Sequence, residues 1–215
     1  MIKILFEHDD FLVCEKPPGQ PFHTEDSAPL KQGFVTAVRA QLSSESLFPV
    51  HRLDKVTSGA MLFAKKPEAN STLSMMFQDK LVEKVYLAVS QKKPKKKQGL
   101  ISGDMKKVRA GSYKLCHTHA NPAITRFYAA RLSEGWGFWL MPKTGKTHQL
   151  RVACKALGSP ILGDQRYGGS EADRCYLHAY RLAFSYQGES YVITSEPREP
   201  RFLEVIAQLE ACEKG

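Results

Sequence analysis

The sequence predicts an α+β protein in which strands outnumber helices. Several short segments alternate apolar and polar residues or form brief apolar runs, which is the pattern of β-strands. A few longer segments carry apolar residues at the spacing of one helix face. Apolar residues make up 42% of the 215 positions, so the chain can bury a substantial core and lacks the composition of a disordered protein. These patterns indicate the fold class but not the order of strands in the sheet.

The N-terminal part is predicted to begin with a β-hairpin and to continue with a helix. Residues 2–6 and 10–15 are the two strands, and an acidic turn joins them. Lys16-Pro17-Pro18-Gly19 ends the second strand, because the prolines require extended geometry and the glycine permits a turn. Residues 31–42 then carry four apolar side chains on one helical face: Phe34, Val35, Val38 and Leu42.

The middle of the chain alternates between strand and helix patterns. Residues 60–64 form an apolar run typical of a buried strand, and Pro67 suits the first turn of a following helix. The apolar stripe of that helix consists of Leu73, Met76 and Phe77. Residues 84–89 alternate again, so Tyr86 is expected on the opposite face from Val85, Leu87 and Val89.

Two further strands and a helix are predicted in the C-terminal half. Residues 124–132 alternate, and residues 136–141 form another strand. Thr147 can cap the N-terminus of a helix that Gly158 closes. Arg151 lies in the middle of this helix, which is a rigid place from which to present a guanidinium.

The positive charge of the chain is concentrated in one segment. The net charge is +9, yet residues 91–114 alone contain nine Lys or Arg and a single acid, Asp104. The lysines and three glycines of this segment predict a long mobile loop or a hairpin. A polyanion such as RNA is the natural partner of such a segment, although a lysine loop that only improves solubility is the alternative.

The cysteines and the N-terminus indicate a reduced, cytosolic protein. The five cysteines are scattered, their number is odd and no pair has C-x-x-C spacing, so we expect free thiols. Cys116-His117-Thr118-His119 lacks the second pair of ligands that a zinc site needs, and we expect no metal. No apolar run approaches the length of a membrane span, and the N-terminus lacks a signal-peptide pattern.

One stretch combines a carboxylate with several cationic or hydrogen-bonding groups: His51-Arg52-Leu53-Asp54-Lys55-Val56-Thr57-Ser58-Gly59. Nearby cations keep an Asp ionised at neutral pH, and an ionised, positioned Asp can act as a nucleophile. The same residues can also form only an ion pair that closes a turn before a strand. The residues alone leave both interpretations of Asp54 open.

His-Arg-Leu-Asp followed by Thr-Ser-Gly resembles the active-site motif of the RluA-type pseudouridine synthases, which isomerise uridine to pseudouridine in RNA. Lys-Pro-x-Gly at 16–19 resembles the first motif of this family, and Lys-x-Tyr-x-Ala at 84–88 resembles the second. Residues 142–152, with Thr-His-Gln-Leu-Arg, resemble the third, and the likeness extends from about residue 3 to about residue 186. The chain departs from the family at three positions where His or Arg is common: Lys146, Ala153 and Ser159.

This resemblance implies a pseudouridine synthase fold, a large mixed or antiparallel β-sheet split into two subdomains with flanking helices and a central catalytic cleft. It implies one catalytic domain over residues 1–215, with a basic insertion at about 91–121 and no separate RNA-binding module. Asp54 would be the nucleophile, Tyr86 would lie over the uridine base, and Arg151 would pair with Asp54. The reaction has no redox step and no group transfer, so we expect no cofactor. Attack at C6 of the base and attack at C1′ of the ribose both remain open.

The expected partner is a stem-loop of ribosomal or transfer RNA from which the target uridine is flipped out. Arg52 is a candidate to fill the vacated stack or to hold a phosphate. The other residues expected on the RNA backbone are Lys92, Lys93, Lys95, Lys96, Lys97, Lys106, Lys107 and Arg109. We expect a monomer in the cytoplasm that binds no membrane.

Two other functions compete with this prediction. A non-catalytic RNA-binding protein or RNA chaperone could keep the same fold, but the presence of Asp54, Tyr86 and Arg151 argues against it. A hydrolase that uses Ser58, or a Cys with a His, has little support, because the sequence has no G-x-S-x-G nucleophile elbow.

Overall fold

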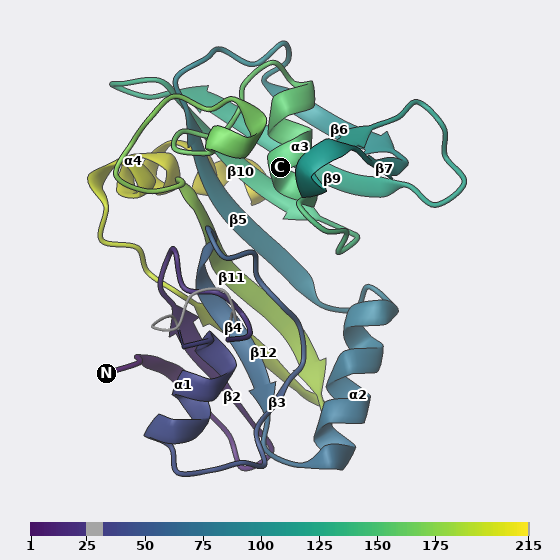
Figure 1. Cartoon of the computed structure of the whole chain (residues 1–215), viewed down its shortest axis with the longest axis vertical. Coiled ribbons are helices and arrows are strands. Elements are labelled where there is room, and N and C mark those ends of the chain that lie inside the picture. Colours follow the sequence, from purple (N-terminus) through teal and green to yellow (C-terminus); the bar gives the residue numbers. More distant parts are fainter. Residues whose placement is uncertain (25–31, 215) are drawn as a thin grey trace. The chain divides into compact units, whose positions relative to one another are not determined.

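The computed structural model describes residues 1–24 and 32–214, and the chain divides into two compact units (Figure 1). Unit 1 comprises Met1–Glu83 together with Ala179–Glu196. Unit 2 comprises Lys84–His178 together with Pro197–Gly215. Unit 1 is therefore built from two separate stretches of the chain.

Unit 1 is a sheet with one helix on each face. Its strands are β1 (Ile4–Glu7), β2 (Phe11–Lys16), β3 (Phe48–Pro49), β4 (Ser58–Ala64), β11 (Leu177–Tyr186, from Ala179 on) and β12 (Glu189–Thr194). They follow the order β1-β2-β4-β11, while β12 pairs with β11 and β3 with β4. The hairpin of β1 and β2 confirms the one predicted around the acidic turn.

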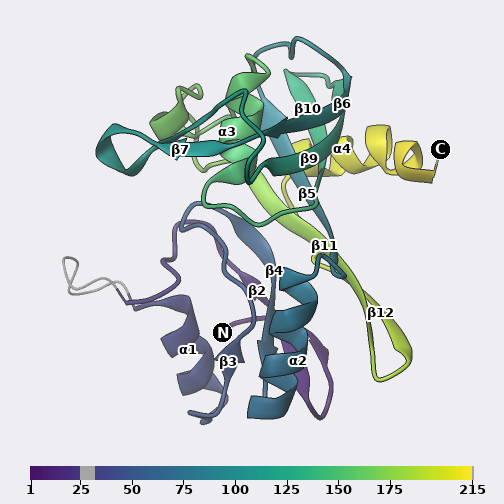
Figure 2. The ribbon, with the colours of Figure 1, turned by 90° about the vertical axis from the view of Figure 1, so that its right-hand side faces the viewer.

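The two helices of unit 1 pack on opposite faces of β4. Helix α2 (Pro67–Gln78) buries Leu73 in a core that includes Leu62, whereas the ring of Phe34 in α1 (Phe34–Gln41) lies 6.0 Å from that of Phe63 (Figure 2). Adjacent strand residues point to opposite faces, which places the helices on the two sides. Pro67 occupies the first turn of α2, as predicted.

Unit 2 contains an antiparallel sheet in the order β5-β10-β9-β6 and a separate two-stranded ribbon of β7 and β8. Its strands are β5 (Glu83–Ser90), β6 (Gln98–Gly103), β7 (Met105–Lys107), β8 (Tyr113–Leu115), β9 (Ala123–Arg131) and β10 (Trp136–Pro142). The helices are α3 (Gln149–Ala156) and α4 (Pro200–Leu209), with short 3₁₀ turns η1 (Arg109–Gly111), η2 (Gln165–Tyr167) and η3 (Glu210–Lys214).

The register of unit 2 assigns its helices to opposite faces of the sheet. Gln149 of α3 donates to Oγ1 of Thr125 on β9, at 2.9 Å. On the other face, a side chain added at Gly137 of β10 would come within 2.7 Å of Val205 in α4, so glycine permits this helix to approach closely. Thr125 and Gly137 belong to opposite faces because the register pairs Gly137 with Ala130.

The elements confirm the α+β class, and the basic segment contains a hairpin, the ribbon of β7 and β8, which is one of the two forms predicted for it. Two sequence-based expectations differ from the structure. Helix α3 begins at Gln149 after His148, whose φ is +58°, so the expected cap at Thr147 is wrong. The predicted helix over 31–42 begins at Phe34, and residue 31 lies outside the described residues.

Within residues 1–24 and 32–214, none of the helices combines the length and the apolar character that a bilayer crossing requires. The same part of the chain contains no cluster of three or more His, Cys, Asp or Glu side chains arranged to hold a metal ion.

Candidate active site

Asp54 lies in the loop between β3 and β4 of unit 1, and its side chain is half-buried. The backbone amide of Thr57 donates to the carbonyl oxygen of Asp54 at 3.0 Å, which closes a tight turn. The side chain of the preceding Leu53 is buried. The loop therefore has an internal hydrogen bond and an apolar anchor beside the carboxylate.

His51 fixes the beginning of this loop. Its Nε2 accepts a hydrogen bond from the amide of Leu62 at 3.0 Å, and its ring stacks on Phe77 with centroids 4.6 Å apart. A ring nitrogen that accepts a hydrogen bond carries no proton, so Nε2 cannot also be part of an imidazolium. His51 thus supports the backbone at the start of the loop.

Lys16 holds the same loop from the side of β2. Its side chain is completely buried, and its ammonium donates to three carbonyl oxygens: Pro17 at 3.0 Å, Lys55 at 3.1 Å and Thr57 at 2.9 Å. Gly19 adds a backbone bond to the same carbonyl of Lys55 at 2.8 Å. A charged donor strengthens such bonds, so the Lys-Pro-Pro-Gly segment fixes the residues that follow Asp54.

Arg52 is exposed on the same loop, and its guanidinium carbon lies 6.0 Å from the centroid of the Phe22 ring. A guanidinium beside an aromatic ring gains a weak cation–π attraction. The position is open to solvent, as a residue that touches RNA must be.

Tyr86 lies on β5 of unit 2, almost completely buried. It pairs with Leu140, which pairs in turn with Phe127 of β9, so these three side chains share one sheet face. Thr125 is on that face too and binds Gln149 of α3. Tyr86 therefore lies on the face that carries α3, and the alternation predicted for residues 84–89 is confirmed.

Lys84 lies two residues before Tyr86, on the same face. Its side chain is buried, and this burial lowers the pKa of the ammonium, as does the positive charge of Lys143. Burial therefore disfavours the charged form of Lys84 on the face that carries Tyr86.

Arg151 lies within α3 with its side chain buried against Asp164. Nε donates to Oδ2 of Asp164 at 2.8 Å, and Nη2 donates to Oδ1 at 2.7 Å, which forms a two-pronged fork. Asp164 was not identified from the sequence as a partner of Arg151, although residue 164 lies within the range of the family likeness. The pairing of Arg151 with Asp54 stays a prediction.

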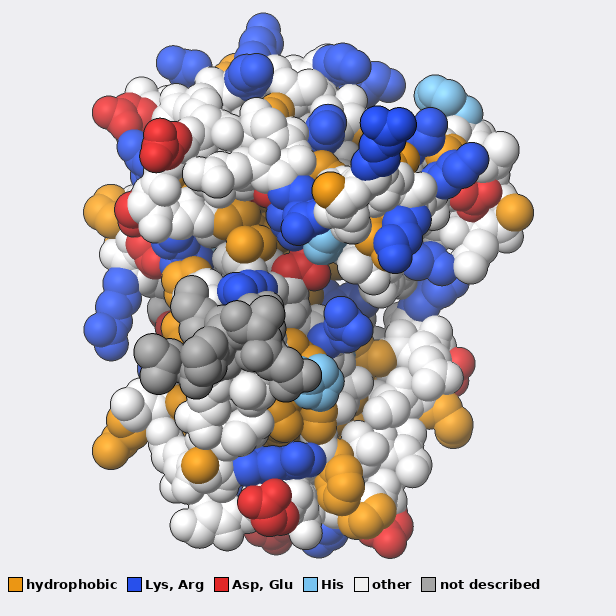
Figure 3. Space-filling view, in the orientation of Figure 1, with side chains coloured by type: hydrophobic (Ala, Val, Ile, Leu, Met, Phe, Trp, Pro, Cys, Tyr) orange, Lys and Arg blue, Asp and Glu red, His pale blue; other side chains and the backbone are white. Residues whose placement is uncertain are grey.

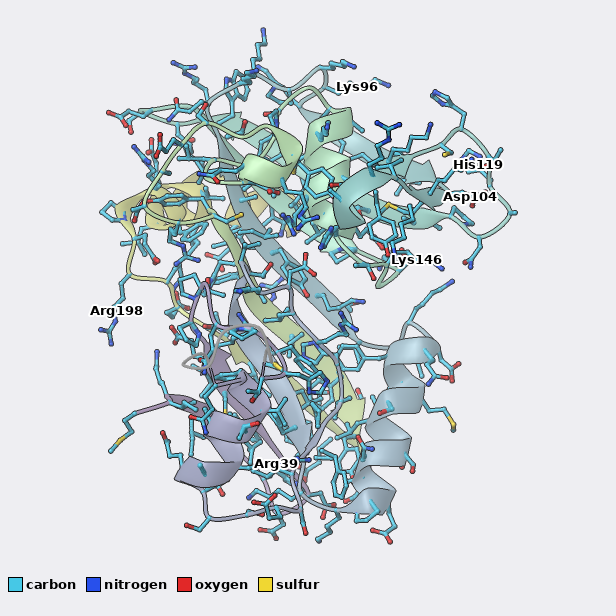
Figure 4. The ribbon with its side chains drawn as sticks, in the orientation of Figure 1. Arg39, Lys96, Asp104, His119, Lys146 and Arg198 are labelled. Carbon is cyan, nitrogen blue, oxygen red and sulfur yellow. The ribbon has the colours of Figure 1, made fainter. Side chains whose placement is uncertain are left out.

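The predicted RNA-binding cations of unit 2 are all exposed and fall into two groups along the chain. Figure 3 shows many Lys and Arg side chains, in blue, on the surface of the upper part of the picture. The turn group, between β5 and β6, consists of Lys92, Lys93, Lys95, Lys96 and Lys97. The hairpin group, on β7 and η1, consists of Lys106, Lys107 and Arg109. Figure 4 shows Lys96 at the top of unit 2 and Asp104 beside the hairpin.

Each group is attached to the unit by its own contacts. In the turn group, the amide of Lys95 donates to the carbonyl of Leu157 after α3, at 2.9 Å. The ammonium groups of Lys93 and Lys97 each lie 6.0 Å from the centroid of the Trp136 ring. At the base of the hairpin, the carboxylate of Asp104 accepts from the amide of Asn121 at 2.7 Å.

The geometry does not favour a hydrolase. The side chain of Ser58 is buried in β4. Burial raises the pKa of the Cys14 thiol to about 12, with a further increase from Glu7, and burial also raises the pKa of Cys154. Both groups are therefore unreactive thiols at neutral pH.

Comparison with known proteins supports the motif-based prediction. Residues 10–156 match the family model described as RNA pseudouridylate synthase, a range that includes Asp54, Tyr86 and Arg151. A relative from Haemophilus influenzae named "Uncharacterized RNA pseudouridine synthase" is 46% identical over 204 residues, which cover 94% of this chain and 90% of the relative. The "Dual-specificity RNA pseudouridine synthase RluA" of Vibrio vulnificus is 34% identical over 207 residues, with 90% and 81% covered.

The fold agrees with solved structures as well. The human protein "RNA Pseudouridylate Synthase Domain Containing 1" superposes with a TM-score of 0.79 at 24% identity, over 100% of this chain and 95% of that one. This confirms the predicted fold. The chain therefore belongs to the RluA-type family and is an RNA pseudouridine synthase, an isomerase that acts on RNA.

Proposed function

We propose that this synthase converts a uridine of ribosomal or transfer RNA to pseudouridine, with Asp54 as the nucleophile. The observation that carries the proposal is the fixation of the Asp54 loop by the buried ammonium of Lys16. A reactive group must be held in one position to be efficient, and this loop has little freedom to move. The choice of RNA follows relatives whose names include "Ribosomal large subunit pseudouridine synthase C" and the dual-specificity synthase above.

The roles of the three residues follow from their chemistry. The carboxylate of Asp54 adds to C6 of the base or attacks C1′, and holds the system together while the base turns. The ring of Tyr86 stacks on the uracil, and its hydroxyl helps to remove the proton from C5. The guanidinium of Arg151, held by Asp164, pairs with the carboxylate of Asp54, as the family motif implies.

RNA recognition combines a flipped base with contacts to the backbone. A stacked uridine is out of reach, so the target base leaves the helix and Arg52 fills the gap or holds a phosphate. The turn group and the hairpin group bind phosphates on either side of the loop.

We further propose that residues 1–215 act as one catalytic domain, with the basic insertion at about 91–121. We propose that the protein is cytoplasmic, since its RNA partner is cytoplasmic, and that it is a monomer. Light scattering of the purified protein tests the oligomeric state.

The test of the nucleophile is Asp54→Asn, which removes the charge but keeps the shape of the side chain. RNA transcripts carrying tritium at C5 of uridine release it only when C5 becomes bonded to C1′. We expect no release from Asp54→Asn with RNA affinity unchanged, and full release from the control Asp9→Asn, an exposed residue of unit 1. Release at the wild-type rate from Asp54→Asn would overturn the proposal. A wild-type protein that binds RNA but releases no tritium would instead favour the non-catalytic RNA-binding function.

The backbone contacts are tested by salt dependence. Replacing the five lysines of the turn group by Gln should lower the log–log slope of affinity against salt by about 0.7 for each phosphate of single-stranded RNA that the variant no longer neutralises. An unchanged slope would remove the turn group from the binding surface. Mapping pseudouridines in cells with and without the protein then identifies the RNA and the position.

A further inference from the structure

We propose that Tyr167 is a positioning residue that couples the basic hairpin of β7 and β8 to the guanidinium of Arg151. In this proposal, RNA held by the hairpin group stabilises the orientation of Arg151 through the hydroxyl of Tyr167. The inference rests on the proposed function, because it assigns the hairpin to RNA binding and Arg151 to the reaction.

The hydroxyl of Tyr167 joins the hairpin to the start of α3. The backbone amide of Tyr113, the first residue of β8, donates to this hydroxyl at 3.0 Å. Nδ1 of His148, the residue before α3, shares a second hydrogen bond with it at 2.8 Å. The rings of Tyr113 and His148 also meet edge to face, with centroids 5.7 Å apart. A single oxygen atom thus connects β8 with the helix that carries Arg151.

The ring of the same tyrosine contacts Arg151. The guanidinium carbon lies 5.0 Å from the centroid of the Tyr167 ring, within the range of a cation–π interaction, and the tyrosine is almost completely buried. Burial raises the pKa of the Tyr167 hydroxyl, so it stays protonated at neutral pH and keeps its hydrogen-bonding capacity. The hydroxyl end therefore contacts the hairpin and α3, while the face of the ring contacts the guanidinium.

Asp164 and Tyr167 belong to one short turn, and both contact Arg151. The amide of Tyr167 donates to the carbonyl of Asp164 at 3.2 Å, and side chains three residues apart in a 3₁₀ turn lie on the same side. Asp164 accepts hydrogen bonds from the guanidinium, and the ring of Tyr167 contacts the same guanidinium. A shift of this turn would move both partners of Arg151 together.

The tip of the hairpin is attached to the same turn. Arg166 donates a hydrogen bond to the carbonyl oxygen of Ala110 in η1, next to Arg109 of the hairpin group. The turn over residues 164–167 therefore contacts the hairpin at two places, Ala110 and Tyr113, and contacts Arg151 at two others. RNA that binds the cations of the hairpin restricts this turn, and with it the guanidinium.

The alternative is that Tyr167 only fills space. Tyr167→Phe separates the two roles, because it keeps the ring on Arg151 and removes only the hydroxyl. A matched control exists in Tyr128→Phe: Tyr128 accepts a hydrogen bond from Arg126 at 2.7 Å and has that guanidinium 5.5 Å from its ring, but the two residues form an exposed pair on β9. Tyr167→Phe removes the hydrogen bonds to Tyr113 and His148, and Tyr128→Phe removes the one to Arg126, in each case from a tyrosine that also contacts an arginine.

The experiment is a double-mutant cycle measured by tritium release in single turnovers at saturating RNA. We expect Tyr167→Phe, which removes both hydrogen bonds of the hydroxyl, to lower the rate at least about fivefold. Replacing the hairpin group by Gln should lower both affinity and saturating rate in the wild type. In the Tyr167→Phe background the same replacement should lower only affinity, so that the two effects on rate are not additive. Amide hydrogen exchange at Tyr113 should increase in Tyr167→Phe and not in Tyr128→Phe.

The outcomes separate this inference from the proposed function. An inactive wild type contradicts the proposed function. An active wild type with a saturating rate unaffected by Tyr167→Phe, or with strictly additive effects of the two changes, overturns the coupling and leaves the proposed function intact. Equal decreases in rate in Tyr128→Phe and Tyr167→Phe also overturn the coupling. Circular dichroism and thermal melting confirm that each variant is folded before its rate is compared.

Discussion

A buried charged side chain holds the Asp54 loop in unit 1, and another holds the guanidinium of Arg151 in unit 2. The two differ in whether they bind backbone or side-chain atoms. For Asp54, the ammonium of Lys16 binds backbone carbonyls beyond the residue. For Arg151, the carboxylate of Asp164 binds the side chain itself. The side chain of Arg151 is thus held directly, whereas the Asp54 loop is held through the backbone of residues that follow Asp54.

A glycine close to each site residue strengthens the parallel. Gly59 follows the Asp54 loop with φ +113°, and a side chain there would meet the carbonyl oxygen of Ala179 at 2.2 Å. Gly163 precedes Asp164 with φ +79°, and a side chain there would meet the carbonyl oxygen of Arg174 at 1.8 Å. In each unit, a neighbouring backbone segment packs against the chain where only a hydrogen fits.

The largest expected effect is that of Asp164→Ala. It leaves the buried guanidinium of Arg151 without its fork, so we expect a decrease of about 3–5 kcal/mol in the free energy of unfolding. Urea denaturation followed by fluorescence measures it. The control Glu134→Ala removes the exposed partner of Arg201, at 2.9 Å, and should cost about 0–1 kcal/mol. Equal effects of the two variants would contradict the distinction between buried and exposed arginine pairs.

The glycines are expected to come next. Gly59→Ala and Gly163→Ala should each cost about 2–4 kcal/mol, since overpacking adds to the strain of a left-handed residue. The controls Gly19→Ala and Gly168→Ala have φ of +79° and +83° but no atoms within 4 Å of the new carbon. They should show only the backbone strain, about 1–2 kcal/mol. Thermal melting compares the four, and a crowded pair as stable as the open pair would contradict the close approach.

Lys16→Met should have a smaller effect on stability but a clear one on activity. It removes the donor of three carbonyl bonds, and we expect a cost of about 1–3 kcal/mol from unpaired carbonyl groups. Because the Asp54 loop loses its fixation, tritium release should fall while RNA affinity is kept. Lys3→Met is the control, since Lys3 is exposed and its ammonium lies 3.1 Å from the carboxylate of Glu15. Normal activity in Lys16→Met would show that the ammonium does not position the loop.

The smallest expected effect is the loss, at acid pH, of the hydrogen bonds that the Asp104 carboxylate accepts at the base of the hairpin. The hydrogen bond from Thr118 lowers the pKa of Asp104, as do those from the amides of Asn121 and Ala120. Because this pKa is lowered, the ionised carboxylate contributes its full stabilisation of the folded state above the ordinary pKa of 3.8. That stabilisation is lost as pH falls through the pKa of the folded state. Exchange of the amides of Ala120 and Asn121 should therefore accelerate, relative to other amides, below about pH 4. Asp104→Asn should show the accelerated exchange already at neutral pH, and its absence there would contradict the role of the carboxylate.

Much of the fold could be predicted because the relevant patterns are local. The alternation around Tyr86 and the helix start at Pro67 depend on a few neighbouring residues. The hairpin of β7 and β8 is short and polar, so it has no alternation by which to distinguish it from a loop. His148, with its left-handed backbone before α3, is likewise set by its contact with Tyr167.

The candidate site shows the same division. Asp54 and Arg151 were found through motifs, but their partners were not, because Lys16 meets Thr57 across 41 positions and Asp164 meets Arg151 across 13. Such contacts exist only after the strands have assembled. A lysine at the end of an apolar strand and an aspartate after Leu-Gly were the available signals, and neither specifies a partner.

The division of unit 1 into two stretches has a consequence for biosynthesis. Its core includes Leu62 of β4 together with Leu182 and Phe184 of β11, so the nascent chain cannot complete this core when residue 83 has been made. At about 5–20 residues per second, the ribosome needs roughly 5–20 s more to supply β11. During that interval β4 lacks its β11 neighbour, and we expect one edge of the emerging N-terminal sheet to stay unpaired.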